Sequence, residues 1–397
     1  MIRQYYLPML FSLLFTVKGL PVYGQNVKDS VEISLRPYAS LRGHMAVYDH
    51  KMELQENASR IGMELNIKKG TLGFIAGGEV QLNMFRGSTS FNVDGSLSSG
   101  FVSIESSQSR QVFGNRLGYL GIDLGKYGIL TIGKQWGVYR DITSYTDRFN
   151  VFGARASATF VGGTDGGETG TGRADQALIY RNRFGNLYIG GQIQARGGNN
   201  DHFIDGFGGS VQYKITDGFF AGAAYNRAFL SDRLIQNGGA IGITGQPTYF
   251  SLGAKYTGKI LDWSVLFVLH KNGDFSQSFY QNPGMEVAQS IMVFNAKGLE
   301  FFGKYKLDKF SILAGYNLYV PDIKNTEIIS GQYHLDPGFK RNDCIVGVSY
   351  HPFNFVQIYS EQRISMGKTS LGEREKSVFT LGLKIDLSKT FIKNFDL

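Results

Sequence analysis

The chain of 397 residues is rich in Phe (30), Tyr (22) and Gly (52), and its 42% hydrophobic content excludes a disordered protein. Its single Cys excludes an internal disulfide framework and a Cys-rich zinc or iron–sulfur site. The net charge of +8 comes from Lys and Arg dispersed along the chain, and without a basic block we expect no binding to nucleic acid.

Residues 1–24 have the pattern of a secretory signal peptide. A positive start at Arg3 precedes a short apolar stretch at 7–17, which is too short to span a bilayer. We expect cleavage after Gly24, which leaves 25–397 as a single domain. No later apolar stretch is long enough for a transmembrane helix, so the exported chain is either soluble or a closed β-barrel.

Alternation of apolar and polar residues with a period of two dominates the mature chain. In 60–68, Ile61, Met63, Leu65 and Ile67 alternate with polar residues or glycine, and a helical period would mix these two faces. Sixteen segments share the pattern and predict strands at 31–46, 59–68, 72–85, 115–124, 128–136, 173–182, 186–196, 206–215, 218–228, 248–257, 260–270, 297–307, 310–320, 340–351, 355–366 and 376–388.

The connections between these segments alternate in length. Turns such as Lys69-Gly70-Thr71 and Asp217-Gly218 follow the even-numbered strands, whereas long loops such as 137–172 and 271–296 follow the odd-numbered ones. A soluble β-sandwich does not sort its loops in this way. An even number of strands with one short and one long end is typical of a transmembrane β-barrel of the outer membrane.

Aromatic residues near the short turns support the barrel. Such residues form a girdle at the membrane interface. Seven lie at this level: Tyr127, Phe184, Phe219, Trp263, Phe310, Phe353 and Phe355. We therefore predict an all-β, sixteen-stranded antiparallel barrel, which is wide enough to hold an aqueous channel. Cys344 is in phase with Val346 and Val348, so we expect it on the outer face.

Motifs for covalent chemistry are weak. Gly367-Lys368-Thr369-Ser370 lacks the earlier glycine of a phosphate loop, and the six His are scattered without metal-ligand spacing. We expect no catalytic residue, no metal and no cofactor. A barrel hydrolase and a soluble secreted binding module stay open as alternatives from other classes.

Three arginines form the most informative set. Arg60, Arg116 and Arg173 each begin a strand that descends from the long-loop end, and Arg36 and Glu79 could join the same wall. The alternation places Arg60 and Arg173 in the lumen. The face of Arg116 also holds Leu120 and Ile122, and we expect those two to pack against the long loop 137–172 folded into the barrel. A cationic wall opposite loop carboxylates would create a transverse field in the pore.

The mature chain resembles the general diffusion porins of Gram-negative outer membranes. The resemblance is carried by Ser59-Arg60-Ile61-Gly62, Asn115 to Gly121, Gly133 to Tyr139, Tyr145-Thr146-Asp147, Phe152-Gly153, Arg173 and Tyr180-Arg181-Asn182. By that resemblance 133–153 matches the third loop, which narrows the pore from inside. The resemblance also matches Arg60, Arg116 and Arg173 to the basic wall, Asp147 to an acid of that loop and Glu79 to a carboxylate of the wall. We add Arg36 to the basic side and Asp141 to the acidic side of the constriction as further candidates.

The chain departs from the family at two places. Val151 stands where a second loop acid is common, so we expect a weaker cation preference or a mild anion preference. Residues 388–397 run past the expected last strand and end in Leu. The resemblance implies a homotrimer in outer-membrane lipid that passes small hydrophilic solutes and ions. A solute-selective channel for phosphate or oligosaccharide is the alternative within transport.

Overall fold

The computed structural model describes residues 30–85, 90–91, 105–106, 113–157, 165–197, 201–280, 288–322 and 333–396. The expected signal segment 1–24 lies outside these residues. Among the described residues, no helix is both long and apolar enough to cross a membrane.

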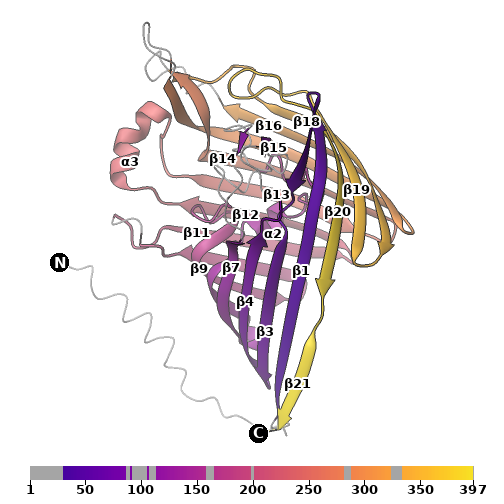
Figure 1. Ribbon diagram of the computed structural model, residues 1–397. Coiled ribbons are helices and arrows are strands. Elements are labelled where there is room, and N and C mark those ends of the chain that lie inside the picture. Colours follow the sequence, from indigo (N-terminus) through magenta and orange to yellow (C-terminus); the bar gives the residue numbers. More distant parts are fainter. Residues whose placement is uncertain are drawn as a thin grey trace, which may run out of the picture.

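Sixteen long antiparallel strands form a closed barrel (Figure 1). Each strand pairs with the next, and β20 pairs with β1 from Tyr38↔Ser388 to Val47↔Phe379, which closes the ring. The strands are β1 (Ser30–Tyr48), β3 (Arg60–Lys69), β4 (Leu72–Leu82), β7 (Phe113–Asp123), β8 (Ile129–Trp136), β9 (Arg173–Phe184), β10 (Leu187–Gln194), β11 (Gly206–Thr216), β12 (Phe219–Ala228), β13 (Thr248–Thr257), β14 (Leu261–Tyr280), β15 (Ala288–Leu307), β16 (Phe310–Asp322), β18 (Arg341–Phe353), β19 (Val356–Ser365) and β20 (Val378–Ser388). All sixteen predicted strands are confirmed.

The two faces of the strands separate apolar from polar side chains. In β3, Ile61 and Met63 are 45% and 52% exposed on the outside, where the bilayer would cover them. Val346 and Val348 of β18 are likewise exposed, and Cys344 shares their phase and is half-buried. The outer surface is therefore apolar, as a lipid-facing barrel requires.

The short turns and the aromatic girdle lie at one end of the barrel. Gly70 and Gly218 have φ of 59° and 78°, the left-handed conformation that tight hairpins place on glycine. Phe219 and Trp263 lie 5.6 Å apart by ring centroids, and Phe353 stacks on Phe355 at 5.6 Å. The aromatic residues predicted near the short turns thus contact one another, from β12 to β14 and between the end of β18 and the turn that follows it.

The remaining elements are short. Those of the strand type are β2 (Lys51–Glu56), β5 (Ser90–Phe91), β6 (Glu105–Ser106), β17 (Tyr333–His334) and β21 (Phe391–Asp396). The helices are α2 (Arg140–Thr143) and α3 (Asp232–Asn237), with 3₁₀ turns η2 (Gly125–Tyr127) and η3 (Gly238–Ile241). β2 forms a hairpin with the upper part of β1 through Asp49 and His50, which both have positive φ.

One predicted loop is wrong, and the chain after the last predicted strand forms a further strand. The loop expected at 271–296 is largely strand, because pairing of β14 with β15 resumes at Asp274↔Phe294 after an irregularity that follows His270. After the last predicted strand, which ends at Ser388, β21 pairs with the first residues of β1, from Ser30↔Asp396 to Leu35↔Phe391. Figure 1 shows this pair extending beyond the other strands at the short-turn end.

A bulge in β7 corrects one orientation. The register shifts between Leu117, which faces Glu79, and Asn115, which faces Val80, so Arg116 is an extra residue. The bulge changes the phase of the strand. Arg116 is therefore buried in the lumen, while Leu120 and Ile122 are 60% and 38% exposed on the outer face. The expectation that these two pack inside the barrel is wrong.

Candidate functional site

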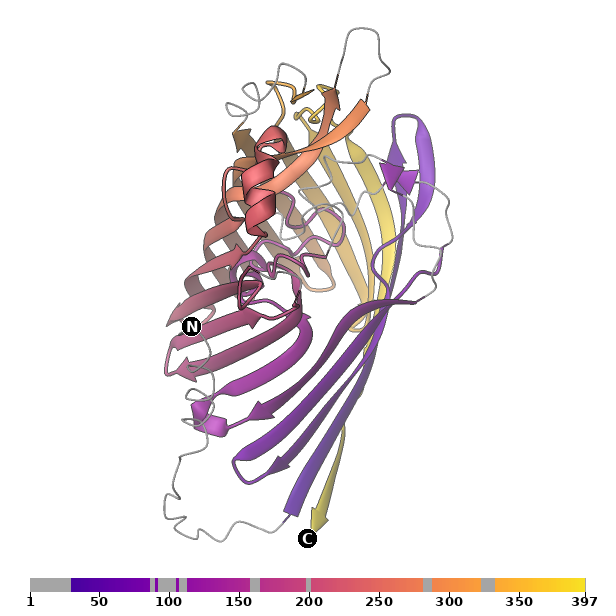
Figure 2. The same cartoon turned by 90° about the vertical axis from the view of Figure 1, so that its left-hand side faces the viewer.

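The third long loop lies inside the barrel. Figure 2 shows the segment that includes α2 inside the barrel. Apolar side chains of this segment pack on the inner wall. Tyr139, Ile142 and Tyr145 join a buried cluster with residues of β12, β13 and β14. Val151 and Phe152 join another with residues of β1, β18, β19 and β20. The loop predicted to fold inward therefore has its own core against the wall.

Two buried glutamates of the wall bind the backbone of this loop. Glu361 of β19 accepts hydrogen bonds from the N–H groups of Asn150 (2.6 Å), Val151 (3.0 Å) and Phe152 (3.4 Å). Glu300 of β15 accepts from the N–H groups of Ala156 and Ser157, both at 2.6 Å, and from the Thr146 hydroxyl. Both carboxylates are at most 1% exposed. Each one satisfies donors that the irregular loop backbone would otherwise bury unpaired.

A third anchor joins the start of the loop to β14 and β16. The Tyr139 hydroxyl lies 3.2 Å from His270 Nε2, and His270 Nδ1 lies 2.8 Å from Asp274 Oδ2. The Tyr319 hydroxyl donates to the same Asp274 oxygen at 2.6 Å. All four side chains are at most 1% exposed, so this polar chain is sealed between the loop and the wall.

The far end of the loop is fixed by a buried ion cluster. Arg155 pairs with Asp343 (2.9 Å) and with Glu375 (2.5 Å), which follows β19. Arg341 donates to the Arg155 carbonyl at 2.7 Å, and Arg363 lies 3.4 Å from Glu375. Breaking such a pair would leave a buried charge uncompensated, so the cluster resists displacement of the loop.

On the opposite wall, Arg60 and Arg116 share one carboxylate. Arg116 Nε lies 2.6 Å from Glu79 Oε1, and Arg60 Nε lies 3.6 Å from Glu79 Oε2. The Tyr38 hydroxyl donates to Glu79 at 2.9 Å, and Arg116 also donates to Gln81 at 3.2 Å. Two guanidinium groups beside one carboxylate leave this wall with excess positive charge.

Arg173 lies apart from that pair and uses a different acid. Its Nε is 3.1 Å from Asp165, a residue of the same long loop, and Lys134 lies 2.8 Å from Asp165. Burial acts to raise the pKa of Asp165, but the hydrogen bond to Lys134 and the charges of Lys134 and Arg173 outweigh it and hold the pKa below its usual range. The Arg173 and Arg140 guanidinium groups flank the Trp136 ring at 5.6 and 4.3 Å.

The other predicted residues take part in separate ion pairs. Arg36 pairs with Glu64 at 2.6 Å near the mouth. Asp147 pairs with Arg140 of its own loop at 2.6 Å, and Asp141 pairs with Arg181 of β9 at 3.0 Å. The loop acids are therefore bound by cations other than the three arginines that the sequence singles out.

A polar cavity of about 620 Å³ lies along the wall formed by β1, β3, β4 and β7. Arg36, Arg60 and Glu79 line it together with residues that the sequence analysis missed as site residues: Arg42, Glu64, Trp136, Arg181 and Asp386. Their inward phase is readable from the alternation. Their closeness is not, because it depends on the tilt and register of strands that are distant in sequence.

These observations define the class of the protein. A closed barrel of sixteen strands, with an apolar exterior, a charged interior and a loop folded inside, is an integral outer-membrane channel protein. The family model for Gram-negative porins matches residues 46–333, which is more than half of the chain. The chain therefore belongs to the Gram-negative porin family, whose members are channels of the outer membrane and not enzymes.

Known proteins agree with this family. The chain is 30% identical over 165 residues to outer membrane protein S2 of Salmonella typhi, covering 36% of this chain and 42% of that protein. It is 25% identical over 289 residues to outer membrane porin F of Xenorhabdus nematophila, covering 68% and 73%. These matches span between two fifths and three quarters of the relatives' own lengths.

Solved structures share the fold at lower identity. The OmpF of Salmonella typhi in complex with daunomycin superposes with a TM-score of 0.64 at 16% identity, covering 89% of this chain and 97% of that one. The outer membrane channel DcaP of Acinetobacter baumannii gives 0.61 at 13% identity, covering 92% and 99%. A trimer form of OmpT from Vibrio cholerae gives 0.55 at 16% identity, covering 89% and 99%.

Proposed function

We propose that the barrel passes small hydrophilic solutes and ions by passive diffusion through a water-filled lumen. The observation that carries this proposal is the asymmetry of the interior. The loop packs on β12, β13 and β14, on β18, β19 and β20, and on Ala46 and Tyr48 near the end of β1, while residues 36–42 of β1 with β3, β4 and β7 keep an open cavity lined by charged groups. Polar solutes gain from such a lining and apolar solutes do not.

The narrow part of this path would lie between the loop and the arginine wall. We assign Arg36, Arg60, Arg116 and Arg173 to the basic side, and Asp141, Asp147 and Glu79 to the acidic side. The contacts support this division in part, because Arg60 and Arg116 flank Glu79 while Asp141 and Asp147 belong to the loop. Since Arg60 and Arg116 share the single carboxylate of Glu79, this level carries excess positive charge, and its field favours anions over cations.

Val151 strengthens the expected anion preference. Its side chain is 4% exposed and packs with Phe152 and Ile345, so it offers an apolar anchor where a carboxylate would have added negative charge. The test is a recording of single channels in planar bilayers under a KCl gradient. A reversal potential with the sign expected for a chloride-selective channel supports the proposal. A reversal potential close to that of a potassium-selective channel contradicts it.

Transport itself is tested with liposomes. Vesicles containing the protein should swell in iso-osmotic solutions of small neutral sugars, at rates that fall with sugar size. Vesicles that stay sealed to the smallest sugar would contradict the channel. Residues 1–24 would direct export, and the mass of the mature chain tests cleavage after Gly24.

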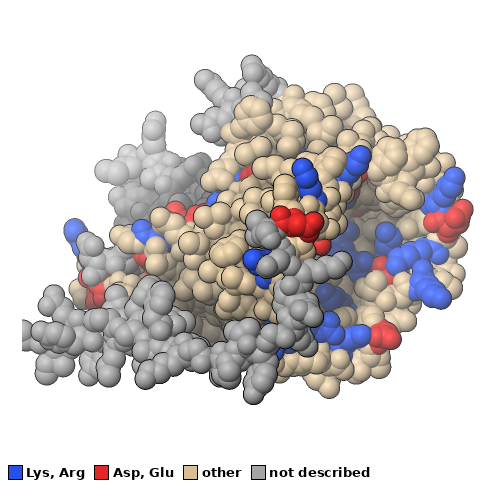
Figure 3. Space-filling model, turned by 90° about the horizontal axis from the view of Figure 1, so that it is seen from below, with Lys and Arg blue, Asp and Glu red and all other residues tan. Residues whose placement is uncertain are grey.

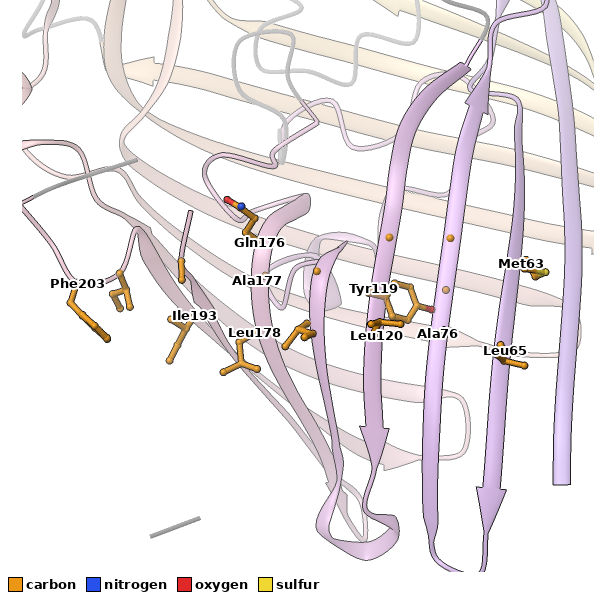
Figure 4. Close-up of a pocket in the computed structure, with 17 residues that line it drawn as sticks. Met63, Leu65, Ala76, Tyr119, Leu120, Gln176, Ala177, Leu178, Ile193 and Phe203 are labelled. Atoms are coloured by element: carbon orange, nitrogen blue, oxygen red, sulfur yellow. The ribbon is translucent and has the colours of Figure 1, made fainter. Parts of the chain in front are cut away.

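We also propose a homotrimer, as in the trimer form solved for the Vibrio cholerae relative. An apolar groove of about 980 Å³ runs over the outer face of β3, β4, β7, β8, β9 and β10 (Figure 4). Met63, Leu120 and Leu178 rise at its sides, and Gly78 and Gly118 lie in its floor, where a Cβ added to either glycine would meet nothing within 4 Å. A second copy could seat side chains there without clashes.

A matched pair of variants tests the trimer. Gly118→Leu fits its own protomer but fills the groove, so it should convert the trimer to monomers in native electrophoresis or light scattering. Gly303→Leu on β15 makes only ordinary contacts, at 3.6 Å from Phe301, and should leave the trimer intact. A monomeric wild-type protein in mild detergent, or a trimeric Gly118→Leu variant, would contradict this interface.

A further inference from the structure

A second set of cations occupies the lumen below the loop. Four lysines face inward near the short-turn end of the barrel, each within five residues of the end of its strand. They are Lys255 of β13, Lys304 and Lys306 of β15, and Lys384 of β20. Arg148 reaches the same zone from the loop. Figure 3 looks into the barrel from this end and shows Lys and Arg side chains gathered around the hollow, with Asp and Glu side chains among them.

Two carboxylates serve most of these cations. Asp262 binds both Arg148, at 2.8 Å, and Lys306, at 2.7 Å. Asp386 binds Lys384 at 2.7 Å and lies 3.9 Å from Arg42. The zone therefore holds more positive than negative charge, even though each of these four cations has an acidic neighbour.

Two ammonium groups have no ion pair within the described residues. Lys304 stands opposite Asp262 in the register of β14 and β15, but that carboxylate is already engaged by its two other partners. The Lys255 ammonium lies over the rings of Tyr145 (4.2 Å) and Phe220 (5.3 Å) instead of a carboxylate. Both can therefore bind an anion without giving up an existing salt bridge.

These cations form a series of small groups on the inner wall. Lys304 lies opposite Asp262, which binds Arg148 and Lys306, and Lys255 faces inward from β13, opposite Ser264 of β14. Asp386 lies between Lys384 and Arg42. Arg42, Arg60 and Asp386 line the same cavity, where Glu79 lies between Arg60 and Arg116. We name this series the cation arc, and it comprises Lys255, Arg148, Lys304, Lys384, Arg42, Arg60 and Arg116.

The arc is unfavourable without counter-anions. Like charges in a confined lumen repel one another, and the walls keep the field inside the pore. A multivalent oxyanion relieves this repulsion more than chloride does, because it can neutralise two neighbours at once. Lysine ammonium groups bind phosphate oxygens as point charges, with three rotatable donors and no demand for a planar partner.

We infer that the cation arc forms a binding track for phosphate and small phosphate esters between the short-turn mouth and the arginine wall. Lys255 and Lys304 would supply its first binding position. The inference rests on the proposed water-filled channel and adds a class of retained solute to it. A phosphate dianion would move along the arc by exchanging one pair of cations for the next.

The test measures block of chloride current by inorganic pyrophosphate in planar bilayers. Pyrophosphate should lower the wild-type current at concentrations where the monovalent anion gluconate does not. In the double variant Lys255→Gln/Lys304→Gln, the concentration for half block should rise at least about fivefold, because two unpaired charges are lost. The control Lys309→Gln changes an exposed lysine of a short turn outside the lumen and should leave the block unchanged.

The outcomes separate this inference from the proposed function. An open chloride current with equal block of wild type and double variant would overturn the cation arc and leave the channel standing. An absence of current through the wild-type protein would overturn both. If the double variant fails to insert, Lys255→Arg/Lys304→Arg, which keeps both charges, must retain the block. The single variant Lys304→Gln must then weaken it.

Discussion

The two halves of the barrel interior use the same kinds of residue for different purposes. On the wall of β1, β3, β4 and β7, Arg36, Arg60 and Glu79 face an open cavity. On the wall of β14, β15, β18 and β19, residues such as Glu300 and Glu361 are at most 1% exposed and hold the loop. An inward polar residue of a wide barrel is therefore either a pore-lining group or an anchor. A residue that the in-folded loop covers is an anchor, and a residue that the loop leaves uncovered lines the pore.

The largest effect is expected at the anchors. Glu361→Ala removes the acceptor for three loop N–H groups and leaves them buried without partners, which should lower the free energy of unfolding by about 3 kcal/mol. A loosened loop should also raise single-channel conductance and current noise. Thermal denaturation in detergent and bilayer recordings measure the two effects.

A control on the open wall sharpens this comparison. Glu64→Ala removes a carboxylate of the cavity that holds no loop backbone, so it should change the unfolding free energy by less than about 1 kcal/mol. If Glu361→Ala left both stability and conductance unchanged, the division of the interior into anchors and pore-lining groups would be wrong.

The next effect concerns ion selectivity on the open wall. Arg60→Ala/Arg116→Ala removes two charges beside Glu79 and should shift the reversal potential toward potassium. One charge about 8 Å from an ion in water contributes roughly 0.5 kcal/mol, so the permeability ratio should change about twofold per arginine. The control is Lys309→Gln, which removes a positive charge from an exposed turn outside the lumen and should leave the reversal potential unchanged. Arg341 is unsuitable as a control because its side chain is fully buried. An unchanged reversal potential in the double variant would remove both arginines from the conducting path.

The division between anchors and lining also marks the limit of the sequence analysis. Strand positions, turn lengths and the inward phase of Arg60 follow from the period of two, because burial in lipid forces apolar residues outward. The orientation of Leu120 cannot be predicted from this period, because the bulge at Arg116 shifts the alternation by one residue and no feature of the sequence marks the bulge. The anchors Glu300 and Glu361 follow the same period as pore-lining residues, so only the path of the loop distinguishes them.

Pairing across the interior is equally hidden in the sequence. The sequence singles out Asp147 and Asp141 as acids that face the arginine wall, yet they bind Arg140 and Arg181. Partners of this kind are set by the three-dimensional course of a long loop, which contains no repeat or turn signal to fix it. The resemblance to porins indicates that the loop enters the barrel, but it cannot supply the contacts of this chain.

A smaller effect should appear in acid, at the end of the loop. Because the pKa of Asp165 is lowered in the folded protein, its pairing with Lys134 and Arg173 stabilises the fold above the unfolded value near 4 and is lost as pH falls through the lower folded value. Asp165→Asn should therefore cost about 1 kcal/mol at pH 7 and nothing near pH 2. Thermal denaturation at both pH values measures the difference. A cost that persists undiminished at pH 2 would show that the carboxylate charge is not what stabilises this end of the loop.

The smallest effect is expected at the mouth of the open wall, where Arg36 pairs with Glu64. Their side chains are 44% and 39% exposed, so solvent screens the pair and its net contribution should be at most about 0.5 kcal/mol. Arg36→Gln should leave the melting temperature nearly unchanged, and its effect on the reversal potential should be smaller than that of either Arg60→Ala or Arg116→Ala and should vanish in high salt. A stability loss comparable with that of Glu361→Ala would mean that the mouth is an anchor as well. The exposed charged residues of the open wall would then stabilise the fold as much as the buried anchors of the loop-bearing wall do.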